Sequence, residues 1–325
     1  MTTAADVLSQ MHEAGMPELP EYLEASGRLR RFGRKKRGWY RLFENIGRTG
    51  RSYLTGAFGY WGLVEGQRIR PAGDIDHDDL ARLREATRAR QEADERARRE
   101  AAERAAMRAA ARWRAATKTG RSAYLVRKLI DAPESVRFEP DGTMLVPMVR
   151  YDLPRDQALV GVQAIAPDGE KRFVKGTAKR GAACRIGCVV VGEPILVAEG
   201  YATAATLRAA VCARLPVFVA FDAGNLEPVV EVLLDAYPQC PILVCADDDF
   251  ATSGNPGRAK ADRLRRRHRV HMIYPVWPAA RSPKDTDFND LHKAVGLHVV
   301  ARQLRAPLRH LGYAGPLASE VRDVA

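Results

Sequence analysis

PILVAEG at Pro194–Gly200 and PILVCADDD at Pro241–Asp249 are two short apolar runs that each end in carboxylates. Glu199 closes the first run, and Asp247 and Asp249 close the second. In an open parallel sheet, ligands collect at the carboxyl ends of the strands. Acidic side chains at those ends therefore favour bound Mg²⁺ and phosphate chemistry.

Predicted strands and helices alternate around these two runs. Strands are expected at 195–198, 217–221, 242–245 and 270–274. The helices between them are expected at 201–213, 225–237 and 258–267. Such alternation is typical of a parallel sheet with right-handed crossovers. The sequence therefore predicts an α/β fold in which helices flank a parallel sheet.

The chain ahead of this domain changes character twice. A long segment is polar nearly all round through Arg84–Arg104, which favours a solvated helix that bridges two modules. A mixed α+β segment follows, with a short helix from Tyr124 and apolar strands at 144–148 and 158–166. The expected parts of the chain are 1–77, a small N-terminal module; 78–116, a helical linker; 117–188, the mixed subdomain; 189–300, the α/β domain; and 301–325, a C-terminal tail.

The N-terminal module combines basic and aromatic side chains. Helices are expected at 4–14 and 20–26, and a β-hairpin with a basic turn at Gly33–Gly38 follows them. Basic residues interleaved with aromatic ones suit a single nucleic-acid strand, through phosphate contacts and base stacking. An aromatic β core with solvated arginines outside it explains the pattern equally well. The candidate DNA-binding residues are Arg31, Arg34, Lys35, Lys36, Arg37, Trp39 and Tyr40.

Composition narrows the class of partner. The 325 residues carry a net charge of +12, which favours a polyanion such as nucleic acid as partner, with solubility alone as the alternative. No apolar run is long enough to span a bilayer, and the polar N-terminus is neither a signal nor a transit peptide, so we expect a cytoplasmic protein with no membrane partner. None of the five cysteines forms a CxxC pair, so no zinc is expected.

The order of the acidic motifs resembles the TOPRIM domain, which is shared by DnaG-type primases, topoisomerases and some nucleases. The resemblance covers about residues 189–292. The motifs that carry it are Glu199-Gly200, DAGN at Asp222–Asn225, the Asp247-x-Asp249 pair, and DFND at Asp287–Asp290.

Segments upstream favour the primases within this group. The stretches YLVRK at 124–128, LVPM at 145–148, VGVQ at 160–163, GEKRF at 169–173 and KG at 175–176 resemble the amino-terminal half of a primase polymerase core. RFG at 31–33, WY at 39–40 and GAFG at 56–59 resemble the small leading module of plasmid and phage primases. Residues 117–188 and 189–300 would then be the first part of the primase core and its TOPRIM catalytic domain.

The resemblance implies a DNA primase of a plasmid, phage or mobile element, which makes short RNA primers on single-stranded DNA from ribonucleoside triphosphates. Glu199, Asp247 and Asp249 would be catalytic and would bind Mg²⁺ or Mn²⁺, with Asp287 as a further ligand. Glu199 could instead accept the proton of the attacking hydroxyl. Asp248 is expected to point away into solvent.

Several polar residues near these motifs have two interpretations each. Asp222 with Asn225 is expected to cap the next helix. Asn289 and Asp290 either organise the Asp287 loop or help to hold metal. The candidate residues for binding triphosphate or template, with a solvated basic face as the alternative, are Lys171, Arg172, Lys175, Lys179 and Arg180.

The sequence departs from the resembling primases in two places and leaves other functions open. Many of them begin with a zinc ribbon, whose ligands are absent here, and the loop after Asp249 delays the expected glycine to Gly257. A TOPRIM nuclease remains an alternative, although it would not need the upstream half. So does a non-catalytic single-strand-binding or helicase-loading module, and a replicative helicase stays open as a partner. A topoisomerase is disfavoured because the chain is short for strand passage.

Overall fold

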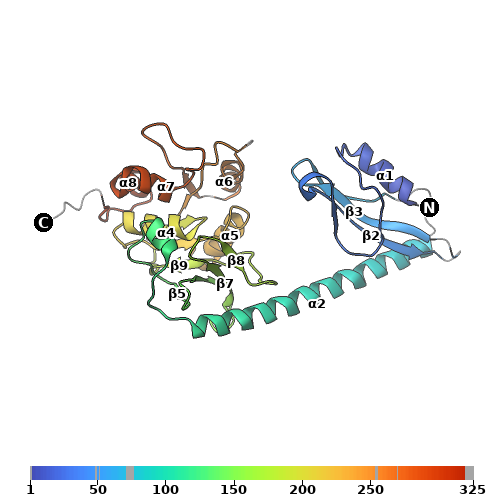
Figure 1. Cartoon of the computed structure of the whole chain (residues 1–325), viewed down its shortest axis with the longest axis horizontal. Helices are drawn as coiled ribbons and strands as arrows, with labels where there is room; N and C mark the ends of the chain where they lie inside the picture. The colour runs from blue at the N-terminus through green and yellow to red at the C-terminus, as the bar shows by residue number, and fades with distance from the viewer. Residues whose placement is uncertain are drawn as a thin grey trace. The chain divides into compact units, whose positions relative to one another are not determined.

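The computed structural model describes residues 2–47, 50, 52–70, 77–252, 255–268 and 270–318 (Figure 1). The chain divides into two compact units, Met1–Ala97 and Arg98–Ala325. The long helix α2 (His77–Ala115) contributes residues to both units. Its bounds agree with the predicted helix at 78–116, but the division falls inside the helix and not at its ends. Among the described residues, no helix has the length and apolar character needed to cross a lipid bilayer.

The first unit is a four-stranded antiparallel sheet with one helix packed on it. The elements are α1 (Ala4–Glu13), β1 (Arg30–Phe32), the 3₁₀ turn η1 (Arg34–Lys36), β2 (Gly38–Ile46), β3 (Ser52–Tyr60) and β4 (Val64–Arg68), with the strands in sequence order across the sheet. Val7 and Met11 of α1 pack on Leu42 and Phe58 of the sheet. The predicted hairpin and its basic turn are confirmed.

The predicted helix at 20–26 is wrong, because pairing with the sheet takes over its backbone. Ser26 forms a β-bridge with Phe43, and the Gly27 amide donates to the Leu42 carbonyl at 2.8 Å. Gly27 has a φ of +69°, the left-handed region that favours glycine. The segment therefore extends the edge of the β-sheet.

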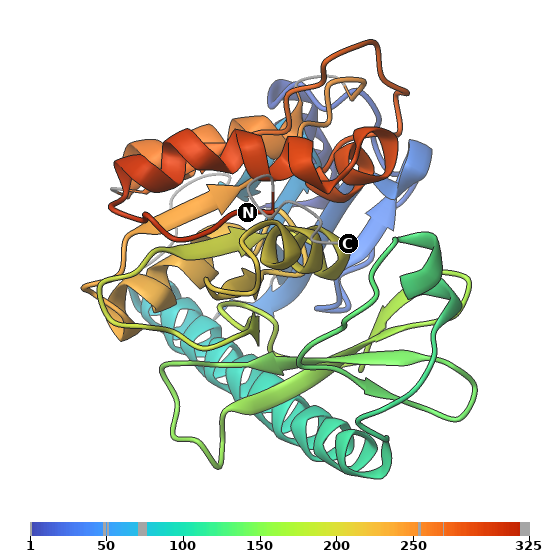
Figure 2. The ribbon, with the colours of Figure 1, turned by 90° about the vertical axis from the view of Figure 1, so that its left-hand side faces the viewer.

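Helix α2 packs on the second unit through small side chains. Ala105 and Ala109 are fully buried, and a Cβ at Gly176 would lie 2.9 Å from the Ala101 carbonyl oxygen, so the backbones approach closely there. The Arg112 guanidinium donates to both carboxylate oxygens of Glu139, at 2.7 and 2.5 Å. The C-terminal part of α2 thus belongs to a folded unit and is more than a solvated linker (Figure 2).

The second unit contains two sheets. The first is antiparallel, in the order β5 (Arg137–Phe138), β6 (Met144–Val149), β7 (Leu159–Ile165), β8 (Lys171–Phe173), and follows the short helix α3 (Ala123–Arg127). The second has the order β13 (His271–Ile273), β12 (Ile242–Cys245), β10 (Ile195–Ala198), β11 (Val217–Val219), β9 (Cys184–Ile186). Its first four strands are parallel, and β9 is antiparallel to β11. The predicted α/β fold with a parallel sheet is confirmed.

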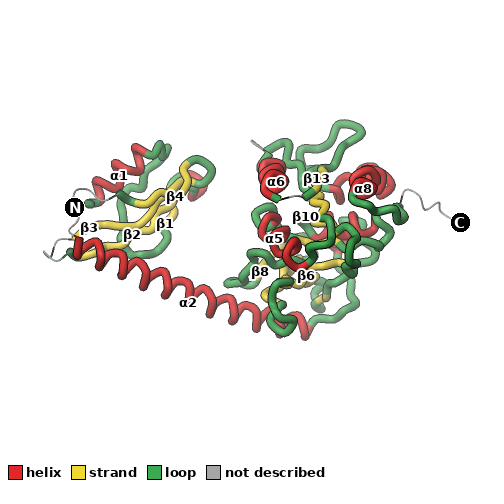
Figure 3. The backbone as a smooth tube through the Cα atoms, turned by 180° about the vertical axis from the view of Figure 1, so that it is seen from behind, coloured by secondary structure: helices red, strands yellow, loops and turns green. Residues whose placement is uncertain are grey.

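Helices cover both faces of this parallel sheet (Figure 3). On one face lie α4 (Tyr201–Ala210), α7 (Phe288–Val295) and α8 (Leu297–His310), and on the other α5 (Leu226–Ala236) and α6 (Pro256–Arg267). Every residue of β10 and β12 is buried, as expected for parallel strands between two helical layers. Leu196 and Ala198 contribute to one core, while Ile195 and Val197 contribute to the other, in the alternation of a strand.

Two predicted boundaries need correction. Strand β9, which falls within the predicted mixed subdomain at 117–188, pairs into the α/β sheet. Residues from 301 onward continue helix α8, where Leu304 and Leu308 are buried on its apolar face, and Leu317 is buried beyond it. The predicted tail therefore starts later than 301, and residues 319–325 lie outside the described residues.

Candidate active site

The acids of the opening motifs lie at the carboxyl edge of the parallel sheet. Glu199 directly follows β10, and Asp247 and Asp249 follow the neighbouring strand β12. Ala198 of β10 pairs in register with Cys245 of β12, so both strands end at the same level. Asp287 joins from another direction, as the N-cap residue of α7. The topology thus brings together four acids that are far apart in the sequence.

The electrostatics of Asp247 show that these acids converge. Burial raises the pKa of Asp247 well above its ordinary value, and the negative charges of Glu199, Asp287 and Asp249 raise it further. Its Oδ1 atom is buried and accepts no hydrogen bond from the described residues. Carboxylates that oppose one another's ionisation are relieved when a cation binds between them. The donor set therefore fits a hard divalent cation such as Mg²⁺, although no three of the described oxygens here lie within 4.8 Å of one another.

Asp287 is held rigidly by two neighbouring helices. Its Oδ1 accepts from the Asp290 amide at 2.8 Å, which caps α7, and its Oδ2 accepts from Thr203 Oγ1 of α4 at 3.0 Å. Burial, and then the charge of Asp290, raise the pKa of Asp287. A carboxylate has about four lone-pair sites, so both oxygens keep capacity for a cation. The helix-capping role was not predicted from the sequence.

Asn289 and Asp290 organise the Asp287 loop. Asp290 Oδ2 accepts from the Thr286 amide at 3.2 Å, and its other oxygen lies 3.4 Å from Lys128 Nζ. The fully buried Asn289 donates to the Lys128 carbonyl at 2.7 Å and to Thr206 Oγ1 at 2.9 Å. Of the two interpretations of these residues, the contacts support the first.

Lys171 of β8 is the basic candidate that faces the acids. A Cβ at Gly200 would lie 3.8 Å from Lys171 Nζ. The protein atoms packed around its ammonium group, and then the Lys128 charge, lower the pKa of Lys171, against the opposing effect of the Asp287, Asp247 and Glu199 carboxylates. Lys171 therefore places a positive charge beside the acidic cluster, although part of its side chain remains exposed.

The other predicted phosphate-binding residues have acidic partners or lie elsewhere. Arg172 pairs with Glu170 at 2.6 Å, Lys179 pairs with Asp222, and Arg180 lies 3.8 Å from Glu231. Lys175 is exposed, and its carbonyl accepts from Arg108 of α2 at 2.9 Å. The structure thus separates Lys171 from the rest of the basic stretch.

Asp248 is not solvated as predicted. Its side chain is only 14% exposed, with Oδ2 2.6 Å from Arg281 Nη2 and Oδ1 2.6 Å from Asn255 Nδ2. Burial alone would raise the pKa of Asp248, but hydrogen bonds from Asn255 and Arg281 hold that pKa below its ordinary value. This ion pair anchors the loop between Asp247 and Asp249.

Asn225 does not cap helix α5 with its side chain, as had been predicted. Its side chain is buried and bonds three backbone groups instead, accepting from the Gly181 amide at 2.8 Å and donating to the Ala182 and Ala220 carbonyls at 2.9 Å each. Asp222 Oδ1 does accept from the Asn225 amide at 3.1 Å. Asn225 therefore ties the 181–182 segment to the end of β11.

The candidate residues of the N-terminal module divide between its core and its surface. Tyr40 is 4% exposed and packs inside the sheet, so it cannot stack on a base as predicted. Trp39 is half-buried, and a Cβ at Gly59 would lie 2.9 Å from its ring. Arg37 donates to the Trp61 carbonyl at 3.0 and 2.7 Å.

The basic turn of this module remains accessible. Arg34, Lys35 and Lys36 form η1 and are exposed. Trp61 is 58% exposed, and the Arg31 guanidinium carbon lies 5.9 Å from the centroid of its ring. Trp61 was not among the predicted binding residues, although its place in the aromatic run was visible in the sequence.

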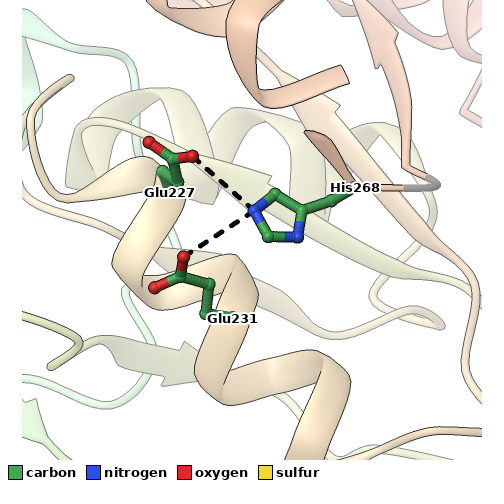
Figure 4. Close-up of side chains that lie close together, drawn as sticks. All are labelled: Glu227, Glu231 and His268. Atoms are coloured by element: carbon green, nitrogen blue, oxygen red, sulfur yellow. Dashed lines mark ion pairs between the residues drawn. The ribbon is translucent and has the colours of Figure 1, made fainter. Parts of the chain in front are cut away.

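Helices α5 and α6 bring together Glu227, Glu231 and His268, which sequence reasoning had not grouped (Figure 4). His268 Nε2 lies 3.6 Å from Glu227 and 3.7 Å from Glu231. Their ligand atoms are close enough to hold a metal ion, but Arg267 already bonds Glu227 Oε1 at 3.0 Å. The contacts describe an ion-pair network that joins the two helices.

Comparison with known proteins agrees with this geometry. Residues 194–297 match the Toprim domain family, so this chain contains a Toprim domain, and the parallel sheet with its acidic edge lies within the match.

The chain is also similar to two proteins of Escherichia coli named DNA primase TraC. One is 32% identical over 171 residues, which cover 50% of this chain and 12% of that protein. The other is 36% identical over 123 residues, or 36% of this chain and 11% of that protein. The chain thus spans a small part of the length of these relatives. The resemblance to TOPRIM primases is confirmed by the Toprim match and these relatives.

Among solved structures, the primase fragment of the bacteriophage T7 primase-helicase protein is 12% identical, with a TM-score of 0.40. The match covers 81% of this chain and 99% of that chain. The fold assignment rests on the Toprim match and on the sheet topology.

Proposed function

We propose that this chain is a cytoplasmic DNA primase that synthesises short RNA primers on single-stranded DNA, for a plasmid, a phage or another mobile element. The observation that carries the proposal is the convergence of Glu199, Asp249 and Asp287 on Asp247, whose pKa they raise, at the edge of a Toprim sheet. The similarity to the TraC primases supports primer synthesis over other phosphodiester chemistry.

Primer synthesis is nucleotidyl transfer, in which a 3′-hydroxyl attacks the α-phosphate of the next ribonucleotide and pyrophosphate leaves. Glu199, Asp247 and Asp249 would hold Mg²⁺ or Mn²⁺, with Asp287 as the fourth acid. When bound, the cation neutralises charge on the phosphates and aligns the attacking and leaving oxygens.

The remaining tasks fall to the side chains around the cluster. Lys171 offers an ammonium group to the triphosphate from β8, on the side of Gly200. Glu199 serves as a ligand or accepts the proton of the attacking hydroxyl. Arg281 and the α7 cap hold the two acidic loops in place, so that little reorganisation is needed when substrate arrives.

Template contacts are assigned to exposed basic surfaces. The turn of η1 with Trp61 offers phosphate contacts and a stacking face to single-stranded DNA. Lys175 and Arg180 provide further exposed charge in the second unit. A replicative helicase is a further proposed partner.

The test is incorporation of labelled ribonucleotides on single-stranded DNA with Mg²⁺ or Mn²⁺. Wild type should make short primers, and Asp247→Asn, which keeps the side-chain shape, should make them at least about 100-fold more slowly. Asp235→Asn, at an exposed acid of α5, is the matched control and should retain activity. Cleavage of nucleic acid without primers would instead support a nuclease, and binding alone would support a non-catalytic module.

A further inference from the structure

A pocket lies on the flank of the Asp247–Asp249 loop, outside the acidic cluster. Its volume is about 550 Å³, and it is bounded by this loop, α6 and the segment after β13. The lining residues that matter here are Asp248, Arg258, Tyr274, Trp277, Arg281 and Gln303. Sequence reasoning assigned no function to this place.

Two residues that line this pocket each carry a buried donor that lacks an acceptor. The Arg281 side chain is only 10% exposed, and while its Nη2 pairs with Asp248, its Nη1 is buried without an acceptor among the described residues. Trp277 Nε1 is also buried without an acceptor among the described residues, and the Trp277 ring centroid lies 5.4 Å from the Arg281 guanidinium carbon. A buried donor left without an acceptor costs free energy, and such groups are rare in folded proteins. An acceptor-rich ligand that reached these two atoms from the pocket would satisfy both.

The two donors are held in place by their surroundings. The Arg281 guanidinium lies over the Phe250 ring at 4.0 Å. Gln303 clamps the backbone next to Trp277, since its side chain accepts from the Val276 amide at 3.0 Å and donates to the Val276 carbonyl at 2.6 Å. The pocket is therefore preorganised, which lowers the entropic cost of binding a ligand.

The charge of the pocket selects an anion. Arg258 is exposed, lies over the Tyr274 ring at 4.8 Å and forms no ion pair with a described residue. Among the lining residues it gives, with Arg281, two positive charges against the one negative charge of Asp248. Asp262 lies behind Tyr274 and is bonded to its hydroxyl at 3.2 Å. Arginine donors arranged in this way suit phosphate oxygens, which accept several charge-assisted hydrogen bonds.

We propose that this pocket binds a phosphate group and holds it beside the acidic edge. The phosphate comes from a ribonucleoside triphosphate or from the backbone of the nucleic-acid strand, an attribution that rests on the proposed function. Asp248 links the two places, since it pairs with Arg281 in the pocket while its neighbours Asp247 and Asp249 belong to the cluster. A phosphate bound to Arg281 would thus act on the catalytic loop through the ion pair of Arg281 with Asp248.

The experiment compares Arg258→Ala with Arg263→Ala in the full chain. Both substitutions remove one exposed arginine from α6, but only Arg258 lines the pocket. Binding of GTP and of a single-stranded DNA oligonucleotide is titrated in EDTA, so that no cation bridges ligand and acids. Arg258→Ala should weaken one of the two probes about tenfold, as expected for loss of a charged hydrogen bond, and Arg263→Ala should weaken neither comparably. Weakened GTP identifies the triphosphate, and weakened DNA identifies the strand.

Trp277→Phe provides a second test that keeps an aromatic ring and removes the buried N–H. It should weaken the same probe as Arg258→Ala, by a few-fold. The proposal is overturned if both variants bind both probes as wild type does, or if Arg263→Ala causes an equal loss. Primer synthesis by wild type is measured separately, so failure of the pocket and failure of the proposed function give different results.

Discussion

The acidic edge of the parallel sheet and the basic turn of the N-terminal module both gather charge, but by different means. At the edge, neighbouring strands end in register and place Glu199 and Asp247 where their charges interact. In the module, Arg34, Lys35 and Lys36 follow one another along the chain and face solvent. The acids at the edge come from different strands and interact with one another, so they act as one group. The basic residues of the turn are exposed neighbours in sequence, so each acts separately. Substitutions should therefore have large, non-additive effects at the edge and small, additive ones in the module.

The largest expected effect is that of Asp247→Asn. It should lower the rate of primer synthesis by on the order of 10²–10³-fold, comparable to loss of a key electrostatic contact. In EDTA the same variant should be more stable than wild type, because it removes like-charge repulsion at a buried position. Thermal melts with and without Mg²⁺ check this, and Mg²⁺ should raise the Tm of wild type more than that of the variant. An equal rise for both would show that the acids do not bind the cation together.

Asn225→Ala should be the most destabilising of the uncharged substitutions considered. It removes the side chain that satisfies three backbone groups near the end of β11, at a cost of about 3 kcal/mol. Urea unfolding measures the loss, with Asn45→Ala, at a half-buried strand position of the first unit, as the comparison. An effect under about 1 kcal/mol would mean that water replaces these hydrogen bonds readily.

Lys171→Ala should raise the KM for ribonucleotides more than the same substitution at the neighbouring Arg172. Because Lys171 lies beside the acidic cluster while Arg172 is paired with Glu170, Lys171→Ala should raise the KM for ribonucleotides about tenfold. Arg172→Ala should change it less than about twofold, within the range of exposed ion pairs. Steady-state primer synthesis at varied nucleotide concentration separates the two, and equal effects would place both residues in one general basic surface.

The smallest effects are expected in the N-terminal module. Lys36→Ala should weaken single-stranded DNA binding two- to threefold and reduce the salt slope by about 0.7. Trp61→Ala should weaken binding somewhat more, by about 1 kcal/mol, through lost base stacking. Tyr40→Phe serves as the control, since it keeps the buried ring and removes only a hydroxyl that accepts from the Glu24 amide at 3.2 Å. A loss for Tyr40→Phe as large as for Trp61→Ala would contradict the division of the module into core and surface.

The sequence predicted correctly those strands whose burial on both faces requires an unbroken run of apolar residues. The strands at 195–198 and 242–245 are continuous apolar runs because both faces of the sheet are covered, and their ends located Glu199, Asp247 and Asp249. Tyr40 was misjudged because adjacent strand residues point to opposite faces, so Trp39 and Tyr40 could not share one surface. The alternating pattern in β2 contained that information.

Other features depended on contacts that no local pattern encodes. Pairing of β9 with β11, the ion pair of Asp248 with Arg281 and the approach of Lys171 to the acids each join segments far apart in the chain. The prediction of a helix at 20–26 was wrong for the same reason, since pairing with β2 outweighed the weak helix propensity of the segment.

The Asp287 side chain accepts one hydrogen bond from α7 and one from α4, and these two bonds limit how this site can change by mutation. An asparagine there would keep the helix cap, because asparagine and aspartate are both good N-cap residues, but would remove the charge from the cluster. An alanine would remove both and also release Thr203. Loss of chemistry and loss of fold can thus be separated at this one position by the choice of substituent. A descendant that kept the domain but abandoned catalysis would be expected to carry asparagine, serine or threonine at position 287.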